Sequence, residues 1–94
     1  MQFSVLMSIY AATKADDLNR CLENLAAQSL VPDQVVLVRD GPVKPGIEQC
    51  IIRHAQNLPL HHLHFPQNRG LGLALRDGLQ ACNHEFVARV DSDD

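Results

Sequence analysis

The chain has 94 residues, enough for one small domain, since most domains run from about 50 to 200 residues. Apolar residues make up 46% of it and charged residues 20%, which is a globular composition and not that of a disordered segment. The net charge of −3 offers no basic surface, so we expect no nucleic-acid partner. Apolar runs such as residues 35–38 are far too short to span a bilayer.

The first half of the chain predicts a strand, a helix and a second strand. Residues 3–10 form a near-continuous apolar run, typical of a strand buried on both faces. Apolar residues then recur at helical spacing over about residues 14–29, and Thr13 is the expected N-cap of this helix. Residues 35–38 predict another buried strand, which ends at the turn formed by residues 40–42.

The second half repeats this alternation twice. Residues 47–58 carry a helical apolar stripe, and residues 60–65 predict a third strand. A turn at residues 68–70 leads into a helix that we expect to pack its apolar side chains, from Leu71 to Cys82, on one face. Residues 86–90 predict the fourth strand. The order β-α-β-α-β-α-β with short connections predicts an α/β, Rossmann-like parallel sheet with helices on both faces.

The histidines could be interpreted as metal ligands, and the cysteines as metal ligands or as disulfide partners. His62 and His64 share one face of the third predicted strand, but no third ligand accompanies them, so we interpret that strand as a polar sheet edge. Cys21, Cys50 and Cys82 fall on apolar helix faces without a C-x-x-C pair. We therefore expect reduced core cysteines in a cytosolic protein.

Polar residues follow all four predicted strands. They are Tyr10, Asp40, the pair Asn68-Arg69, and the acidic tetrapeptide at residues 91–94. Ligands of open parallel sheets bind beyond the carboxyl ends of the strands. We therefore expect a binding site at this edge.

The acidic tetrapeptide suits a divalent cation. In an extended chain the carboxylates of Asp91 and Asp93 point to the same side. Mg²⁺ and Mn²⁺ prefer such oxygen ligands and share them with phosphate oxygens. A solvated acidic turn is the alternative. Arg89 lies in the apolar strand before it and is expected to form a structural salt bridge, although a supporting role at the site stays open.

Four segments resemble, in order and spacing, the successive blocks of family 2 glycosyltransferases. They are residues 4–10 (S-V-L-M-S-I-Y), 35–42 (V-V-L-V-R-D-G-P), 68–72 (N-R-G-L-G) and 88–94 (A-R-V-D-S-D-D). The resemblance spans essentially the whole chain. It implies the nucleotide-binding half of a GT-A fold, with strand order 3-2-1-4.

The resemblance also implies a function. The expected enzyme moves a sugar, with inversion, from a nucleotide-diphospho-sugar (a UDP-sugar) to an unknown acceptor in polysaccharide or lipopolysaccharide biosynthesis. Mn²⁺ or Mg²⁺ would be the cofactor. The expected location is the cytoplasm, with the full-length protein peripheral to the inner face of the membrane.

Site residues follow from the same resemblance. The backbone around Ser8 and Tyr10 would line the base and ribose pocket, and Asp40 would accept a hydrogen bond from N3–H of uracil. A carboxylate only accepts hydrogen bonds, so Asp40 would favour uracil over cytosine, whose N3 is an acceptor. A plain turn residue is the alternative for Asp40.

For the remaining positions, the resemblance places Arg69 near the base and diphosphate. Asp91 would contact the ribose or a metal-bound water, and Asp93 would ligate the metal directly. Many members carry Asn after the tyrosine, where this chain has Ala11-Ala12, so the shape of that loop stays open.

The chain stops on its acidic tetrapeptide, so we expect a single truncated domain at residues 1–94. The family's catalytic base would lie beyond Asp94, and no catalytic residue is therefore assigned. The fragment is expected to be inactive alone and to self-associate through the bare edge of its fourth strand.

Two other classes of protein share this α/β pattern but differ in the loop after the first strand. A receiver-like, flavodoxin-type module would carry its acidic pair after the first strand, where this chain has Tyr10-Ala11-Ala12. A nucleotidyltransferase would carry a glycine-rich, basic loop at the same place, and none is present.

Overall fold

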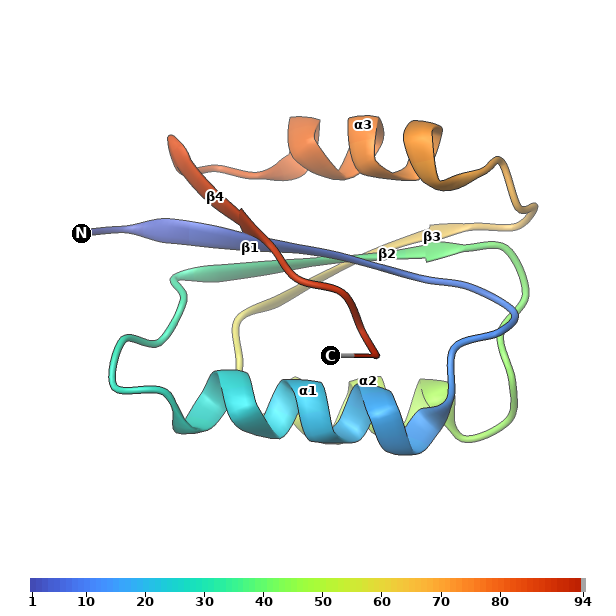
Figure 1. Ribbon diagram of the computed structural model, residues 1–94, viewed down its shortest axis with the longest axis horizontal. Coiled ribbons are helices and arrows are strands. Elements are labelled where there is room, and N and C mark those ends of the chain that lie inside the picture. Colours follow the sequence, from blue (N-terminus) through green and yellow to red (C-terminus); the bar gives the residue numbers. More distant parts are fainter. Residues whose placement is uncertain (94) are drawn as a thin grey trace.

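A computed structural model describes residues 1–93 of the chain. Helices and strands alternate strictly along it (Figure 1). Asp94, the last residue of the acidic tetrapeptide, lies outside the described residues. The elements are β1 (Phe3–Ile9), α1 (Ala15–Ala27), β2 (Gln34–Asp40), α2 (Ile47–His54), β3 (Leu60–Phe65), α3 (Leu71–Ala81) and β4 (Phe86–Arg89).

The four strands form one parallel sheet in the order β3-β2-β1-β4, as predicted. Helices α1 and α2 cover one face and α3 covers the other (Figure 1). The central strands β1 and β2 pair in the register Val5 with Val35, and β1 pairs with β4 in the register Val5 with Ala88. All strands run the same way, so their carboxyl ends lie at one edge of the sheet.

Burial on both faces explains why the two central strands are so apolar. Side chains of β1 and β2 alternate between two cores, one against α1 and α2 and a smaller one under α3. The larger core includes Met7, Leu22 and Leu37, and the smaller core includes Leu6 and Val38.

Helix α3 packs on the sheet through its smallest residues. Ala74 and Gly78, four positions apart, are its buried residues. The predicted apolar face of this helix was therefore wrong in part, because Leu71 and Leu79 are 53% and 55% exposed. A narrow contact centred on Ala74 and Gly78 leaves these leucines on the flanks of the helix.

The predicted N-cap of α1 was also wrong. The helix begins at Ala15 after Lys14, and no side chain caps it. Thr13 instead closes the turn that follows β1. Its hydroxyl accepts a hydrogen bond from the Tyr10 amide at 3.0 Å, and its own amide donates to the Tyr10 carbonyl at 3.1 Å. This reciprocal pairing fixes the loop that the sequence had left open.

The histidines lie on an edge strand, as expected, and two of the three cysteines lie in the core, whereas Cys82 follows the end of α3. Strand β3 is an edge of the sheet, and the exposed rings of His62 and His64 stack on one side of it. Residues 1–93 contain no group of three potential metal ligands drawn from His, Cys, Asp and Glu. Cys21 and Cys50 are buried, Cys82 is half-buried, and none of them forms a disulfide within this part of the chain. Burial raises the pKa of the Cys50 and Cys82 thiols.

Within residues 1–93, no helix has both the length and the apolar character needed to cross a membrane.

Candidate functional site

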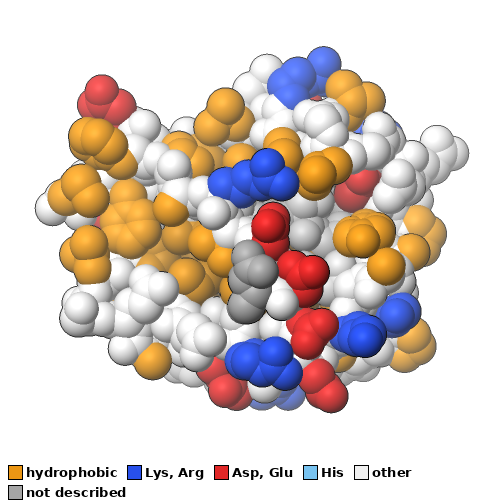
Figure 2. Space-filling model, viewed as in Figure 1, with side chains coloured by type: hydrophobic (Ala, Val, Ile, Leu, Met, Phe, Trp, Pro, Cys, Tyr) orange, Lys and Arg blue, Asp and Glu red, His pale blue; other side chains and the backbone are white. Residues whose placement is uncertain are grey.

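A pocket of about 470 Å³ opens at the carboxyl ends of β1 and β4. Figure 2 shows the side of the molecule on which β4 and the C-terminal segment lie, and acidic side chains form a band near the centre of this view, with lysine and arginine side chains around it. The walls come from the end of β1, the start of α1, the first turns of α3 and the segment after β4. The lining residues are Ser8, Tyr10, Ala12, Thr13, Lys14, Asp17, Leu71, Leu75, Arg89, Val90, Asp91, Ser92 and Asp93.

The β1 wall carries two predicted site residues. Ser8 is half-buried near the end of the strand, and Tyr10 follows the strand with 49% of its surface exposed. The turn closed by Thr13 fixes the backbone of Tyr10. An exposed aromatic ring on a fixed backbone can stack on a planar ligand group.

The β4 wall carries the acidic motif. The Val90 amide donates to the Leu6 carbonyl at 3.0 Å, which extends the pairing with β1 one residue beyond the strand. Ser92 and Asp93 then form a turn, so the expectation of an extended chain through the motif was wrong. Asp91 and Asp93 nevertheless line the same pocket.

Arg89 forms the expected salt bridge, at the mouth of the pocket and not in the core. Its guanidinium lies 3.6 Å from the Asp91 carboxylate, and both side chains are more than half exposed. Such an exposed pair contributes little to stability. The salt bridge therefore adjusts the charge of the pocket more than it holds the fold together.

The donor set of this pocket fits a divalent cation shared with a phosphate. Magnesium-type sites take one or two protein carboxylates and fill their other positions with water and phosphate oxygens. Asp91 and Asp93 are two carboxylates on one wall. The described residues contain no group of three potential metal ligands. A site that shares its ion with a phosphate does not need a third protein ligand.

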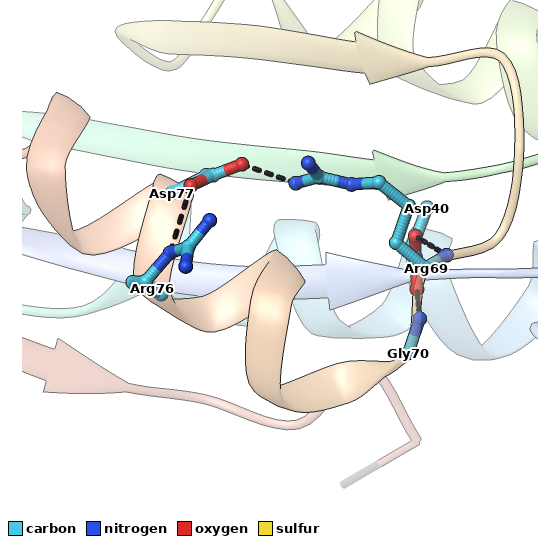
Figure 3. A network of polar contacts seen from close by, with 5 residues as sticks. All are labelled: Asp40, Arg69, Gly70, Arg76 and Asp77. Atoms are coloured by element: carbon cyan, nitrogen blue, oxygen red, sulfur yellow. Dashed lines mark hydrogen bonds and ion pairs between the residues drawn. The ribbon is translucent and has the colours of Figure 1, made fainter.

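Asp40 is not a lining residue of the pocket. It ends β2 with only 3% of its surface exposed. One carboxylate oxygen accepts from the Arg69 amide at 2.9 Å and the other from the Gly70 amide at 3.2 Å (Figure 3). The Asn68 side chain donates to the Asp40 carbonyl at 3.2 Å. Asp40 thus fixes the loop at residues 68–70, from which α3 begins.

Arg69 also lies outside the lining. Its guanidinium stacks over the Phe65 ring, 4.3 Å from the centroid, and forms an ion pair with Asp77 of α3. Arg76 contacts the same carboxylate (Figure 3). The hydrogen bond from Arg69 is the main reason why the pKa of Asp77 is lowered.

The predicted residues therefore form two groups. Ser8, Tyr10, Asp91 and Asp93 share the pocket, whereas Asp40 and Arg69 organise the loop behind it. The groups are connected through α3, because the loop held by Asp40 positions the first turn of α3, and Leu71 in that turn lines the pocket.

Two charged lining residues were missed in the sequence. Lys14 and Asp17 stand at the start of α1 and line the pocket together with the residues that follow β4. The sequence did contain a signal, since the start of a helix after a parallel strand lies at the same sheet edge as the strand ends. The prediction considered only residues that follow the strands, so it did not include these two residues at the start of α1.

Comparison with known proteins identifies the family. The sequence model described as "Glycosyl transferase family 2" matches residues 4–94. The chain belongs to glycosyl transferase family 2.

Curated relatives of this glycosyltransferase family 2 chain carry consistent names. An "Uncharacterized glycosyltransferase" of Haemophilus influenzae is 46% identical over 94 residues, which are 100% of this chain and 35% of that protein. The amylovoran biosynthesis glycosyltransferase AmsE of Erwinia amylovora is 47% identical over 98% of this chain and 35% of its own length. A UDP-Gal:α-D-GlcNAc-diphosphoundecaprenol β-1,3-galactosyltransferase of Escherichia coli is 37% identical over 99% of this chain and 34% of its own length. The chain thus spans about a third of the length of these relatives.

Solved structures confirm the GT-A fold of this family 2 chain. The mannosyltransferase PcManGT of Pyrobaculum calidifontis, in complex with GDP-Man and Mn²⁺, superposes with a TM-score of 0.84 at 25% identity. It is matched over 98% of this chain and 27% of its own. Residues 1–349 of S. aureus TarS, in complex with UDP-GlcNAc, give a TM-score of 0.80 at 28% identity, over 99% of this chain and 27% of that one.

Proposed function

We propose that this chain is the donor-binding part of an inverting glycosyltransferase that takes its sugar from a UDP-sugar. One observation carries the proposal: Ser8 and Tyr10 from β1 and Asp91 and Asp93 from β4 line one pocket at the carboxyl edge of the sheet. The sugar's bond to the diphosphate would break as an acceptor hydroxyl attacks from the opposite face, and the hydroxyl proton would pass to a base. We assign no residue of this chain as that base.

Asp93, with Asp91 beside it, would hold Mn²⁺ or Mg²⁺ against the diphosphate. A bound divalent ion neutralises the charge that develops on a departing diphosphate. Asp91 would reach the ribose or a metal-bound water. Its salt bridge with Arg89 at 3.6 Å keeps the Asp91 carboxylate directed along this wall.

The uridine would lie along the end of β1, against the backbone of Ser8 and Tyr10. Asp40 would read the uracil N3–H. Its two oxygens already accept one backbone amide each, and a carboxylate has about four acceptor positions, so acceptor capacity remains. Arg69 would act beside the base and diphosphate through the loop at residues 68–70, where Phe65 and Asp77 hold its side chain.

Names of relatives support the wider setting. AmsE is named for amylovoran biosynthesis, and the name of the Escherichia coli relative specifies a diphosphoundecaprenol-linked acceptor. We propose a role in polysaccharide or lipopolysaccharide biosynthesis, in the cytoplasm and at the inner face of the membrane for the full-length protein. We further propose that residues 1–94 transfer no sugar alone, because the resemblance to the family puts the base beyond Asp94.

Separate titrations of three nucleotides test which nucleotide the donor sugar carries. UDP, GDP and CDP are titrated into the chain by calorimetry, each with Mn²⁺ and again after chelation of the metal. We expect UDP to bind most tightly and to require the metal. Equal binding of UDP and CDP would remove Asp40 as the reader of the base. A preference for GDP would replace the UDP-sugar by a GDP-sugar.

A further inference from the structure

The charged side chains that line the pocket are not all paired with one another. Its lining contains the carboxylates of Asp17, Asp91 and Asp93 and the cationic groups of Lys14 and Arg89. Asp17 forms an ion pair with Arg20 at 3.5 Å, and Arg89 forms one with Asp91 at 3.6 Å. Lys14 makes no ion pair within residues 1–93, although its exposed side chain lines the same pocket as the acidic motif.

We propose that Lys14 is a further ligand-binding residue of this pocket and that it contacts the diphosphate of the nucleotide. This inference rests on the proposed function, because it needs a nucleoside diphosphate in the pocket. A lysine ammonium offers three donors on a flexible stem and binds phosphate as a point charge. Lys14 stands on the α1 wall and the acidic motif on the β4 wall, so a diphosphate between them would meet the metal on one side and Lys14 on the other.

The other cation is less suited to this role. The Arg89 guanidinium is already paired with Asp91, and drawing it to a phosphate would remove it from that carboxylate. No ion pair with another residue of the range 1–93 restrains the Lys14 side chain. Its backbone carbonyl accepts from the Leu18 amide at 3.1 Å, which fixes the main chain at the start of α1 while leaving the side chain able to move.

A substitution that removes only the charge tests the inference. Lys14→Gln is compared with Lys44→Gln, a matched control, because Lys44 is also exposed but lies beside α2 at a separate hollow. UDP and uridine are each titrated by NMR in the presence of Mg²⁺, which is diamagnetic and leaves the signals near the pocket observable. Exposed charge pairs contribute up to about 1 kcal/mol, so we expect about fivefold weaker binding of UDP by Lys14→Gln, with uridine unaffected. Lys44→Gln should bind both ligands as the parent does, and Lys14→Arg should retain most of the affinity for UDP.

The outcomes separate this inference from the proposed function. If the parent binds UDP in a metal-dependent way and Lys14→Gln binds it equally well, the role of Lys14 is wrong and the function stands. A loss of UDP and uridine in the same proportion would also overturn the contact with phosphate, because it would indicate a change in the shape of the pocket. If the parent does not bind UDP at all, both proposals fall together.

Discussion

Asp40 is a buried carboxylate that holds two distant parts of the chain together. It joins the end of β2 to two backbone amides that are 29 and 30 residues later in the chain. The Cβ of any residue placed at Gly41 would lie 2.7 Å from the Asn68 backbone nitrogen, and Gly41 has a φ of 88°. Glycine at this position lets the two loops come close enough for the Asp40 contacts.

Replacing Asp40 by Asn should destabilise the chain. The amide group keeps the shape, but its NH₂ side would face one of the two backbone donors and leave that N–H unpaired. We expect the free energy of unfolding to fall by about 1–3 kcal/mol, measured by urea denaturation. Glu48→Gln is the control, because Glu48 is exposed in its pair with Arg39. A loss for Asp40→Asn no larger than that of the control would refute a structural role for the Asp40 contacts.

The sequence predicted several residues that line the candidate pocket, but it did not predict the hydrogen bonds that hold the loops around it. Tyr10, Asp91 and Asp93 could be placed together because parallel strands end at one edge, a rule that needs no side-chain detail. The amide partners of Asp40 could not be predicted, since they depend on how closely two loops approach. The role of Thr13 was missed for a similar reason, because a hydroxyl before a helix can bond the preceding turn as readily as the helix start.

Among the elements, α3 depends most on close packing. A Cβ at Gly78 would lie 2.5 Å from Leu6 Cδ1 and 2.7 Å from Val38 Cγ2, and both of these side chains are buried. Both distances are too short for carbon atoms in contact, so Leu6 and Val38 would have to shift within the close-packed core under α3. Gly78 therefore sets the height of α3 above the sheet.

Gly78→Ala is expected to lower the free energy of unfolding by about 1–2 kcal/mol. Overpacking costs about 1–3 kcal/mol, and the better helix propensity of alanine offsets up to about 1 kcal/mol of this. Gly72→Ala is the matched control on the same helix. Among residues 1–93, no atom lies within 4 Å of a Cβ at Gly72, so Gly72→Ala should raise stability by about 0.5–1 kcal/mol. Chemical denaturation of both variants checks the difference, and equal effects would contradict the close approach at Gly78.

Helices α1 and α2 are joined by a polar contact around Asn19. The Asn19 side-chain oxygen lies 2.8 Å from His54 Nε2 and accepts from Arg53 at 2.7 Å, while its amide donates to Glu23 at 2.9 Å. His54 is buried, and its burial is the main cause that lowers its pKa below 6.5, with the nearby Arg53 charge adding to the effect.

His54 should make the fold less stable in mild acid. Its pKa is lowered in the folded state, so the unfolded chain takes up the proton first as the pH falls below 6.5. The stabilisation is therefore present above that pH and is lost as the pH falls through the lower, folded-state pKa. We expect His54→Gln to lose less stability than the parent between about pH 7.5 and pH 5 in urea denaturation. His84→Gln serves as the control, and an unchanged pH dependence in His54→Gln would count against this assignment.

At the scale of the whole molecule, the alternating pattern predicted the parallel α/β sheet, whereas the strand order 3-2-1-4 was implied by the resemblance to the family. Each predicted strand agrees with the observed one within two residues at either end, because buried parallel strands are short, apolar and bounded by turns. Helix α2 was predicted too long. It ends at His54, yet Leu58 beyond it is still buried, so the apolar spacing continued after the helix had stopped.

The two edges of the sheet differ in how they are protected. The β3 edge carries exposed histidines, whereas β4 exposes 55% of Phe86 and has no strand on its outer side within residues 1–93. We expect the 94-residue chain to self-associate through this edge, so its mean mass in light scattering should rise with concentration. Phe86→Lys should reduce the association, because charge on an edge strand opposes pairing. A single monomeric mass over the whole concentration series would contradict this expectation.

The most direct test of the donor site is calorimetric titration of UDP in the presence of Mn²⁺, with Asp93→Asn compared to the parent. Glu85→Gln removes the same charge from an exposed residue outside the pocket lining and is the matched control. We predict that Asp93→Asn weakens UDP binding by at least about tenfold, or about 1.4 kcal/mol, and abolishes its dependence on the metal. Glu85→Gln should match the parent. Metal-dependent UDP binding of unchanged strength in Asp93→Asn would contradict the assignment of the acidic motif as the metal site.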